Sequence, residues 1–236
     1  MSLSFRPRWI FTLLTAVAVT AFVGLGYWQW QRGVARKASW EAFERGNLPA
    51  QPAAPGELAG LPRFTRVAVQ GQWDAAHQFL LDNISHDGQP GYDVLSMLRL
   101  TDGRLLPVNR GWVPFSGYRE RLPDVSLTAD GSVTITGRLS TLPVAGLASG
   151  RQAPAPDGPW PRVTSFPTID ELAQAVREPL LPQVLLLDRD SGAGYLREWL
   201  PPGMSPDRHF SYAVQWWLFA AIAFGLYVAL NLKVAR

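Results

Sequence analysis

Two long apolar segments near the ends of the chain limit what it can fold into more than any other feature. The first, at 9–31, reads WIFTLLTAVAVTAFVGLGYWQWQ, and the second, at 210–232, reads FSYAVQWWLFAAIAFGLYVALNL; neither contains a charged residue. A helix needs about 20 apolar residues to cross the hydrocarbon core of a bilayer. We therefore predict two transmembrane helices, at 9–31 and 209–232, in preference to a cleaved signal peptide followed by a single span.

The charges separate these segments from the rest of the chain. Five of the 22 basic residues flank the apolar segments, which leaves seventeen basic and nineteen acidic residues between 33 and 208. The intervening domain is therefore close to neutral, and it lacks the basic footprint of a nucleic-acid-binding protein. The absence of cysteine excludes disulfide bonds, thiolate metal sites and a cysteine nucleophile.

Two spans place both termini on the same side of the membrane. We expect segments 1–8 and 233–236 to be cytoplasmic and residues 32–208 to form an extracytoplasmic, periplasmic domain. The 176-residue loop is too long for the positive-inside rule to decide the orientation. The short stretch before the first span leaves no room for a transit peptide, so we expect a bacterial inner membrane.

The domain between the spans has a strand-rich pattern. Alternating or short apolar runs typical of strands occur at 64–73, 78–83, 93–101, 104–114, 132–140 and 183–190. Asp102-Gly103 predicts a hairpin in which both turn residues have positive φ, and a second such dipeptide, Asp130-Gly131, precedes the strand at 132–140. We therefore predict an α+β membrane protein, whose domain is mostly antiparallel β with one or two short helices.

Helical and irregular segments complete this prediction. Thr168 and Glu171 have the spacing of a capping box, which predicts a helix from Thr168 onward. Residues 32–45 have the composition of a short helix next to the membrane. The proline-rich segment 49–62 is expected to be an extended connector that does not pack, and 143–161 to be a long surface loop.

The domain contains no recognisable catalytic constellation. His77 and His86 fall in expected loops without zinc-ligand spacing, and the sequence has neither a nucleophile elbow nor a P-loop. A Ser/Lys peptidase would need a desolvated lysine, whereas Lys37 stands beside Arg36 in a polar stretch. We predict that the protein is not an enzyme.

The membrane end of the second span is the most informative site. His209, Tyr212 and Trp216 are spaced to share one helical face, and Trp28, Gln29 and Arg32 of the first span lie at the same level. Small residues that permit close helix contact accompany them: Gly24, Gly26 and Ala213. A neutral imidazole is a common haem ligand, and arginines can pair with propionates. The alternative is that the aromatic residues only anchor the helices.

In order along the chain, several motifs resemble those of the surfeit locus protein one family. The first helix ends in a G-x-W-Q-x-x-R pattern, and the second begins with H-x-x-Y-A-x-x-W. Between them come R-x-V-x-V-x-G-x-W/Y-D, G-Y/F-x-V-L and V-N-R-G-W-V-P. The matching positions are Gly26, Trp28, Gln29, Arg32, Arg63 to Asp74, Gly91 to Leu95, Val108 to Pro114, His209, Tyr212, Ala213 and Trp216. Ser96 and Met97 depart from the pattern, which usually has a proline there.

The resemblance implies an assembly factor for cytochrome c oxidase that binds haem a and helps to insert it into the catalytic subunit. His209 matches the proposed iron ligand, Tyr212, Trp216, Trp28, Gln29 and Arg32 would surround the ring, and haem a synthase is a further implied partner. The residues themselves are compatible with haem a or haem b. The alternative is a cofactor-free scaffold that stabilises an assembly intermediate by protein contacts. Arg110, Gly111 and Trp112 are interpreted as structural.

Overall fold

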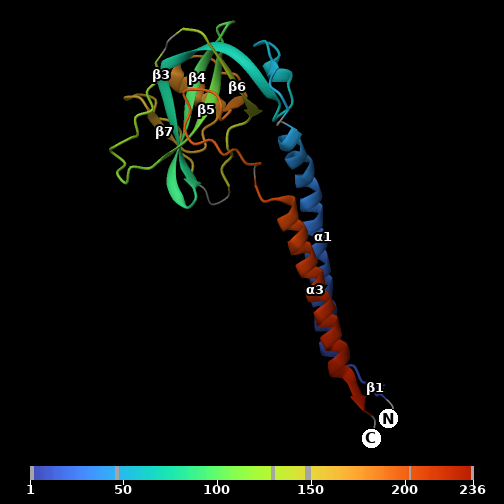
Figure 1. Cartoon of the computed structure of the whole chain (residues 1–236). Coiled ribbons are helices and arrows are strands. Elements are labelled where there is room, and N and C mark those ends of the chain that lie inside the picture. The colour runs from blue at the N-terminus through green and yellow to red at the C-terminus, as the bar shows by residue number, and fades with distance from the viewer. Residues whose placement is uncertain (1–2, 46–47, 129–130, 147–149, 202, 235–236) are drawn as a thin grey trace. The chain divides into compact units, whose positions relative to one another are not determined.

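In a computed structural model of the chain, the described residues are 3–45, 48–128, 131–146, 150–201 and 203–234. They form two compact units. The first consists of Met1–Ala42 and Pro201–Arg236, and the second of Phe43–Leu200. Figure 1 labels the elements of both units.

The first unit is a pair of long helices, α1 (Trp9–Arg45) and α3 (Pro206–Asn231). Both are long and apolar enough to cross a membrane, and only 6% and 11% of their apolar windows are buried. The helix predicted at 32–45 is confirmed, but it is not separate, because α1 continues through it without a break. Between Trp9 and Arg45 there is no proline to interrupt the helix, and the last turns are rich in good helix formers.

The two helices of this unit are antiparallel and bring the terminal segments together. Short strands β1 (Leu3–Phe5) and β9 (Leu232–Val234) pair in antiparallel register at one end of the helices. Near this end, the hydroxyl groups of Thr12 and Tyr227 are 2.8 Å apart. The strands β1 and β9, which lie next to the two termini, are therefore at the same end of the helix pair.

The second unit is a mixed sheet with small helical elements. Its strands are β2 (Gln51–Pro52), β3 (Arg66–His86), β4 (Gln89–Leu100), β5 (Leu105–Pro114), β6 (Val133–Ser140), β7 (Arg162–Thr164) and β8 (Val184–Leu187), and its helices are η1 (Leu58–Gly60) and α2 (Ile169–Val176). The longest pairings are antiparallel, as predicted. Three short pairings, β2–β3, β3–β7 and β5–β8, are parallel, so the sheet is more mixed than the sequence predicted.

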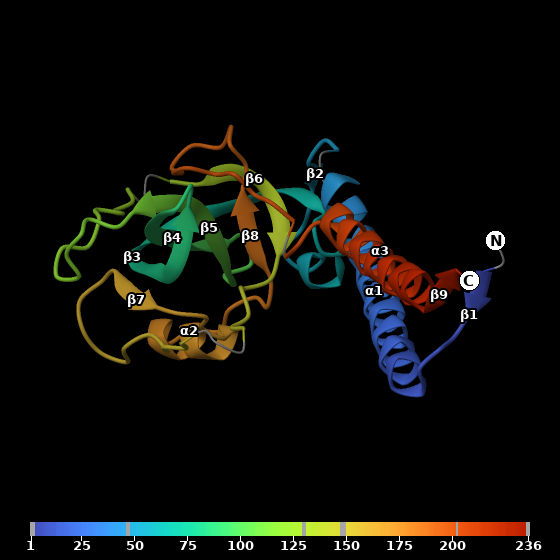
Figure 2. The same ribbon diagram turned by 90° about the horizontal axis from the view of Figure 1, so that it is seen from below.

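The main strands of this unit close into a barrel. The hydrogen-bonded order β3-β4-β5-β8-β6 returns to its start, because β6 also pairs with the first part of β3 (Figure 2). All five strands contribute apolar side chains to one buried cluster, for example Val69, Leu98, Val108, Ile135 and Leu185. Closure removes the exposed strand edges that an open sheet would present.

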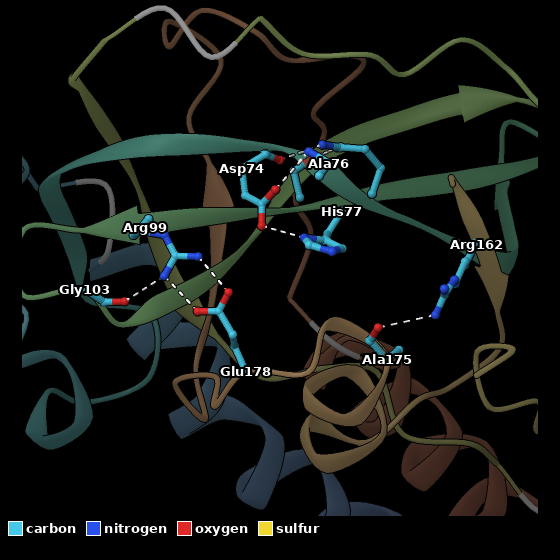
Figure 3. A network of polar contacts seen from close by, with 10 residues as sticks. Asp74, Ala76, His77, Arg99, Gly103, Arg162, Ala175 and Glu178 are labelled. Carbon is cyan, nitrogen blue, oxygen red and sulfur yellow. Dashed lines mark hydrogen bonds and ion pairs between the residues drawn. The ribbon is translucent and has the colours of Figure 1, made fainter. Parts of the chain in front are cut away.

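Strand β3 is a single strand where the sequence predicted two. Irregularities at Asp74/Gln78 and Leu81/Ile84 bend it without ending it. At the first irregularity, the Asp74 carboxylate accepts a hydrogen bond from the Ala76 backbone N–H at 2.9 Å, so that the bulged amide is paired (Figure 3). The bend explains the error, since the apolar alternation of the sequence changes phase at a bulge.

Helix α2 confirms its predicted capping box. Thr168 Oγ1 accepts from the backbone N–H of Glu171, and the Glu171 carboxylate accepts from that of Thr168 at 2.8 Å. Leu172 and Val176 of α2 pack against apolar residues of β3 and β4, such as Phe79. Helix α2 therefore covers one outer face of the barrel.

The hairpin between β4 and β5 is confirmed, although its turn differs from the prediction. The Gly103 backbone N–H donates to Leu100 at 2.9 Å, and Gly103 alone of the two turn residues has positive φ, at 88°. This is the pattern of a turn followed by one left-handed residue, which needs only one glycine-like position. Asp102 instead binds Arg104, with 2.7 Å between carboxylate and guanidinium.

The proline-rich segment 49–62 packs against the barrel, contrary to the prediction. Its β2 pairs with β3, and Leu58 in η1 is fully buried in the barrel core. The prediction failed because it considered only composition, whereas Ala53, Leu58 and Leu61 of this segment pack against the barrel core. Asp130 of the second predicted turn and residues 147–149 of the predicted loop lie outside the described residues.

Arg110, Gly111 and Trp112 of β5 hold the chain segment that follows β8. The Trp112 backbone N–H donates to Leu196 at 2.8 Å, and a Cβ atom at Gly111 would lie 2.5 Å from the Leu196 carbonyl oxygen. Arg110 is buried and donates to the carbonyl oxygen of Ala193 at 2.6 Å. These contacts support the structural interpretation of the three residues.

Candidate functional site

The paired helices of the first unit bring His209 against Gln29. The imidazole Nδ1 of His209 lies 2.8 Å from Oε1 of Gln29. His209 is in the first turn of α3, after an N-cap at Ser205 whose hydroxyl accepts from the Arg208 backbone N–H at 3.4 Å. Of the predicted site residues on α1, Gln29 is the one that contacts the histidine.

Helix geometry places the other predicted residues of α1 on one side of this contact. Successive helix residues are about 100° apart around the axis. Counted from the facing residues Gln29 and His209, Trp28, Arg32 and Tyr212 lie on the same side of the antiparallel pair. Trp28 and Tyr212 are 51% and 45% exposed, so this side is open. The Arg32 guanidinium lies over the Trp28 ring, 5.7 Å from its centroid.

On the opposite side of the helix pair, aromatic side chains contact one another, and Trp30 and Trp217 are 42% and 37% exposed. The rings of Trp30 and Phe210 have centroids 4.8 Å apart, and Trp30 is 6.0 Å from Trp217. Trp216 lies close to the contact plane and stacks on Phe22 at 5.8 Å. The pair is therefore asymmetric, with packed aromatic rings on one side and an aromatic and cationic face on the other.

Small residues allow the two helices to approach closely. Ala213 is fully buried, as predicted, and a Cβ atom at Gly26 would overlap the Trp217 ring. Gly24 has no atom within 4 Å of such a position, so its predicted role in helix contact is wrong. Gly33 takes that role, since a Cβ atom there would lie 2.6 Å from the Phe210 ring. The seven-residue spacing of Gly26 and Gly33 was the signal that could have found it.

The contact with Gln29 determines what His209 can do chemically. An amide oxygen only accepts hydrogen bonds, so Nδ1 is the donor in this contact, and in the neutral imidazole Nε2 then keeps its lone pair. Metal-ligating histidines commonly donate their second ring N–H in this way, which fixes the tautomer and the ring orientation. The donor set thus fits a haem iron, with Trp28 and Tyr212 offering aromatic surface and Arg32 a cation for a propionate.

The other histidines lie in the second unit, on β3 rather than in loops as predicted. His77 is 2.7 Å from the Asp74 carboxylate (Figure 3). Its ring meets that of Trp160 edge-on, with 4.8 Å between the ring centroids. His86 is 3.6 Å from Glu198. Among the described residues, no group of three or more His, Asp or Glu side chains is arranged to hold a metal ion.

Lys37, considered for a peptidase, lies on the exposed surface of α1. Its ammonium group is 3.8 Å from Glu41, and 64% of its side chain is accessible. Lys37 therefore lacks the desolvated setting that a Ser/Lys peptidase needs.

Comparison with known protein families gives a match over most of the chain. A family model described as the SURF1 family matches residues 16–221, which include most of α1, the whole second unit and more than half of α3. No curated protein matches the chain.

Proposed function

Since the chain belongs to the SURF1 family, which is associated with cytochrome c oxidase assembly, we propose that it binds haem a and aids its insertion into the catalytic subunit. The observation that carries this proposal is the 2.8 Å contact between His209 and Gln29, which leaves Nε2 of the imidazole available as a ligand. We further propose that haem a synthase supplies the cofactor. Such a protein is an assembly factor rather than an enzyme.

The proposal requires the helix pair to lie in a membrane. Large apolar side chains are exposed along both helices, for example Leu14 at 60% and Ile222 at 56%. Contiguous apolar surface of this kind is unfavourable in water and favourable in lipid. We place the helices in a bacterial inner membrane, with both termini in the cytoplasm and the β-rich unit in the periplasm.

In this proposal, each residue of the open face has a separate role. His209 ligates the iron, and Gln29 holds the imidazole in the tautomer that exposes Nε2. Trp28 and Tyr212 offer apolar ring surface, and Arg32 pairs with a propionate at the water boundary. Bound haem supplies the redox-active iron that the oxidase later uses.

Transfer of haem to the oxidase requires that the protein release the bound haem. A single histidine ligand is easier to exchange than two, and an open face allows a partner to approach. The packed side, with Trp30, Phe210 and Trp217, holds the helices together while the open face changes partners. Trp216, stacked on Phe22, supports the helix turn below His209.

The test is an absorption spectrum of the full-length protein, purified in a neutral detergent from cells that synthesise haem a. We expect a Soret band in the wild type that is lost in His209→Ala. His86→Ala is the matched control, because it removes a histidine from the other unit and should keep the band. Thermal unfolding establishes that all three proteins are folded.

Haem-free, folded wild-type protein would contradict the proposal. It would favour the alternative, a scaffold that stabilises an oxidase assembly intermediate by protein contacts. Equal Soret bands in wild type and His209→Ala would likewise remove His209 from the site.

A further inference from the structure

The second unit contains a cavity lined by arginine side chains. These arginines are distant in sequence from Gln29, the α1 residue that contacts His209. Its charged lining consists of Arg66, Arg138, Arg189, Arg197, Asp188 and Asp190, and its volume is about 450 Å³. We call it the arginine pocket. It draws on β3, β6 and the segment after β8, so the barrel fold assembles it from three distant parts of the sequence.

Positive charge exceeds negative charge in the arginine pocket. The lining contains four guanidinium groups and two carboxylates. One of the carboxylates, that of Asp188, interacts with several of the arginines. Arg66 Nε lies 2.7 Å from the Asp188 carboxylate, and the same carboxylate also attracts Arg138 and Arg197. Glu198 pairs with Arg189 from outside this lining, with 3.3 Å between the charged groups. The excess is therefore about one positive charge, which suits an anion.

The arginines are held in place by the fold. Arg138 is 8% exposed, and its guanidinium lies 4.0 Å from the centroid of the Phe43 ring. Arg197 donates to the carbonyl oxygens of Asp188 and Ser191, both at 2.7 Å. Their positions are therefore set before any ligand arrives, which lowers the entropic cost of binding.

Burial of the Arg138 and Arg197 guanidinium groups is energetically unfavourable, because it removes charged groups from water. Desolvation lowers the pKa of Arg138 and of Arg197 below the ordinary value of arginine, although Asp188 acts in the opposite direction. A bound anion would offset the unfavourable free energy of this desolvation. Guanidinium groups match the geometry of phosphate oxygens and can bind them in pairs.

We propose that the arginine pocket binds a phosphate group, either as free phosphate or as the phosphomonoester headgroup of a lipid. Phe43 and Trp199 form an apolar part of the wall that would accept the carbon atoms next to such a headgroup. The inference goes beyond the proposed function, because none of these residues belongs to the helix face that includes His209. It is tested separately from haem binding.

The test is isothermal titration of the full-length protein in neutral detergent with sodium phosphate, at constant ionic strength against sodium chloride. Arg189→Gln should weaken phosphate binding and Asp190→Asn should strengthen it, each roughly fivefold, as expected for one unit charge a few ångströms away in water. Both residues are exposed, so the variants should fold. Arg177→Gln and Asp157→Asn are the matched controls, because they make the same changes at an exposed ion pair with 3.5 Å between the charged atoms.

Opposite effects of the two pocket variants, with unchanged controls, would support the proposal. Absence of binding, or equal effects of pocket and control variants, would overturn it for free phosphate. A parallel titration with short-chain phosphatidic acid identifies the source, since binding of the lipid alone assigns the pocket to a headgroup. Failure of both ligands would refute the proposal and leave the haem site unaffected.

Discussion

Replacing Gln29 by leucine tests whether the contact across the helix pair prepares His209 for ligation. Leucine has nearly the same size, but it cannot accept the hydrogen bond that His209 Nδ1 makes at 2.8 Å. The imidazole is then free to rotate and to move its proton to Nε2, the atom that has to bind iron. We therefore expect Gln29→Leu to bind haem more weakly while remaining folded.

The expected loss follows from two contributions. A neutral hydrogen bond contributes about 1 kcal/mol, which corresponds to roughly a fivefold change in affinity. Loss of the correct tautomer and ring orientation adds to this, and removal of such hydrogen-bond partners typically costs about 10–100-fold in metal affinity. We expect haem affinity to fall by about 10–100-fold. Gln29→Glu, which keeps an acceptor oxygen, should retain most of the affinity.

The assay is titration of haem-free protein in neutral detergent with haem a, followed by the Soret absorbance. Gln31→Leu is the matched control, since Gln31 donates to the Tyr27 hydroxyl at 2.8 Å and is two residues away on α1. Its affinity should equal that of the wild type. Equal affinities of Gln29→Leu and wild type, with His209 still required, would refute the reasoning about the tautomer.

Three further results are expected. Leu58→Ala should lower the free energy of unfolding of the β-rich unit by about 2–5 kcal/mol, since the side chain is fully buried; urea titration with pulse proteolysis measures this. Gly33→Leu should push α1 and α3 apart and lower the thermal stability of the helix pair in detergent. Hydrogen bonding from Arg99 lowers the pKa of Glu178, so the pair stabilises the fold above the ordinary glutamate pKa of about 4.3. That contribution should disappear as the pH falls through the lower, folded-state pKa, and Glu178→Gln should remove this part of the acid dependence in urea titrations at several pH values.

Matched control variants separate these effects from a general loss of stability caused by any substitution. Leu200→Ala changes a side chain that is 79% exposed, so its effect should stay within about 0.5 kcal/mol. Gly24→Leu is the control for Gly33→Leu. It adds the same side chain to α1 at a position where a Cβ atom would have no neighbouring atom within 4 Å. Glu120→Gln is the control for Glu178→Gln, because it makes the same change at an exposed glutamate. Equal effects in a test variant and its control would contradict the corresponding prediction.

Local features of the sequence were sufficient for much of the secondary structure. The apolar length of the two end segments predicted α1 and α3, the capping box predicted α2, and Asp102-Gly103 predicted the β4–β5 hairpin. Each of these signals depends on residues within a few positions of one another. Errors arose where a local pattern changes, as at the bulge after Asp74, where one strand was interpreted as two.

The candidate site was only partly predictable for the same reason. Helical spacing placed His209, Tyr212 and Trp216 near one face, and the order of the spans placed Gln29 at the same level. Which α1 residue contacts His209 depends on how the helices are rotated against each other. That rotation is set by Gly26, Gly33 and the aromatic rings that pack on them, and a single-helix pattern does not contain it.

What the sequence alone determined is therefore the inventory of apolar spans, strands and caps, because short-range hydrogen bonding and periodic burial are encoded locally. Only the tertiary structure decided that β6 returns to β3, pairing Arg66 with Arg138, and that β8 lies between β5 and β6. These pairings join segments more than forty residues apart, and they depend on the packing of the whole barrel core. The arginine pocket and the Gln29–His209 contact are consequences of such long-range packing.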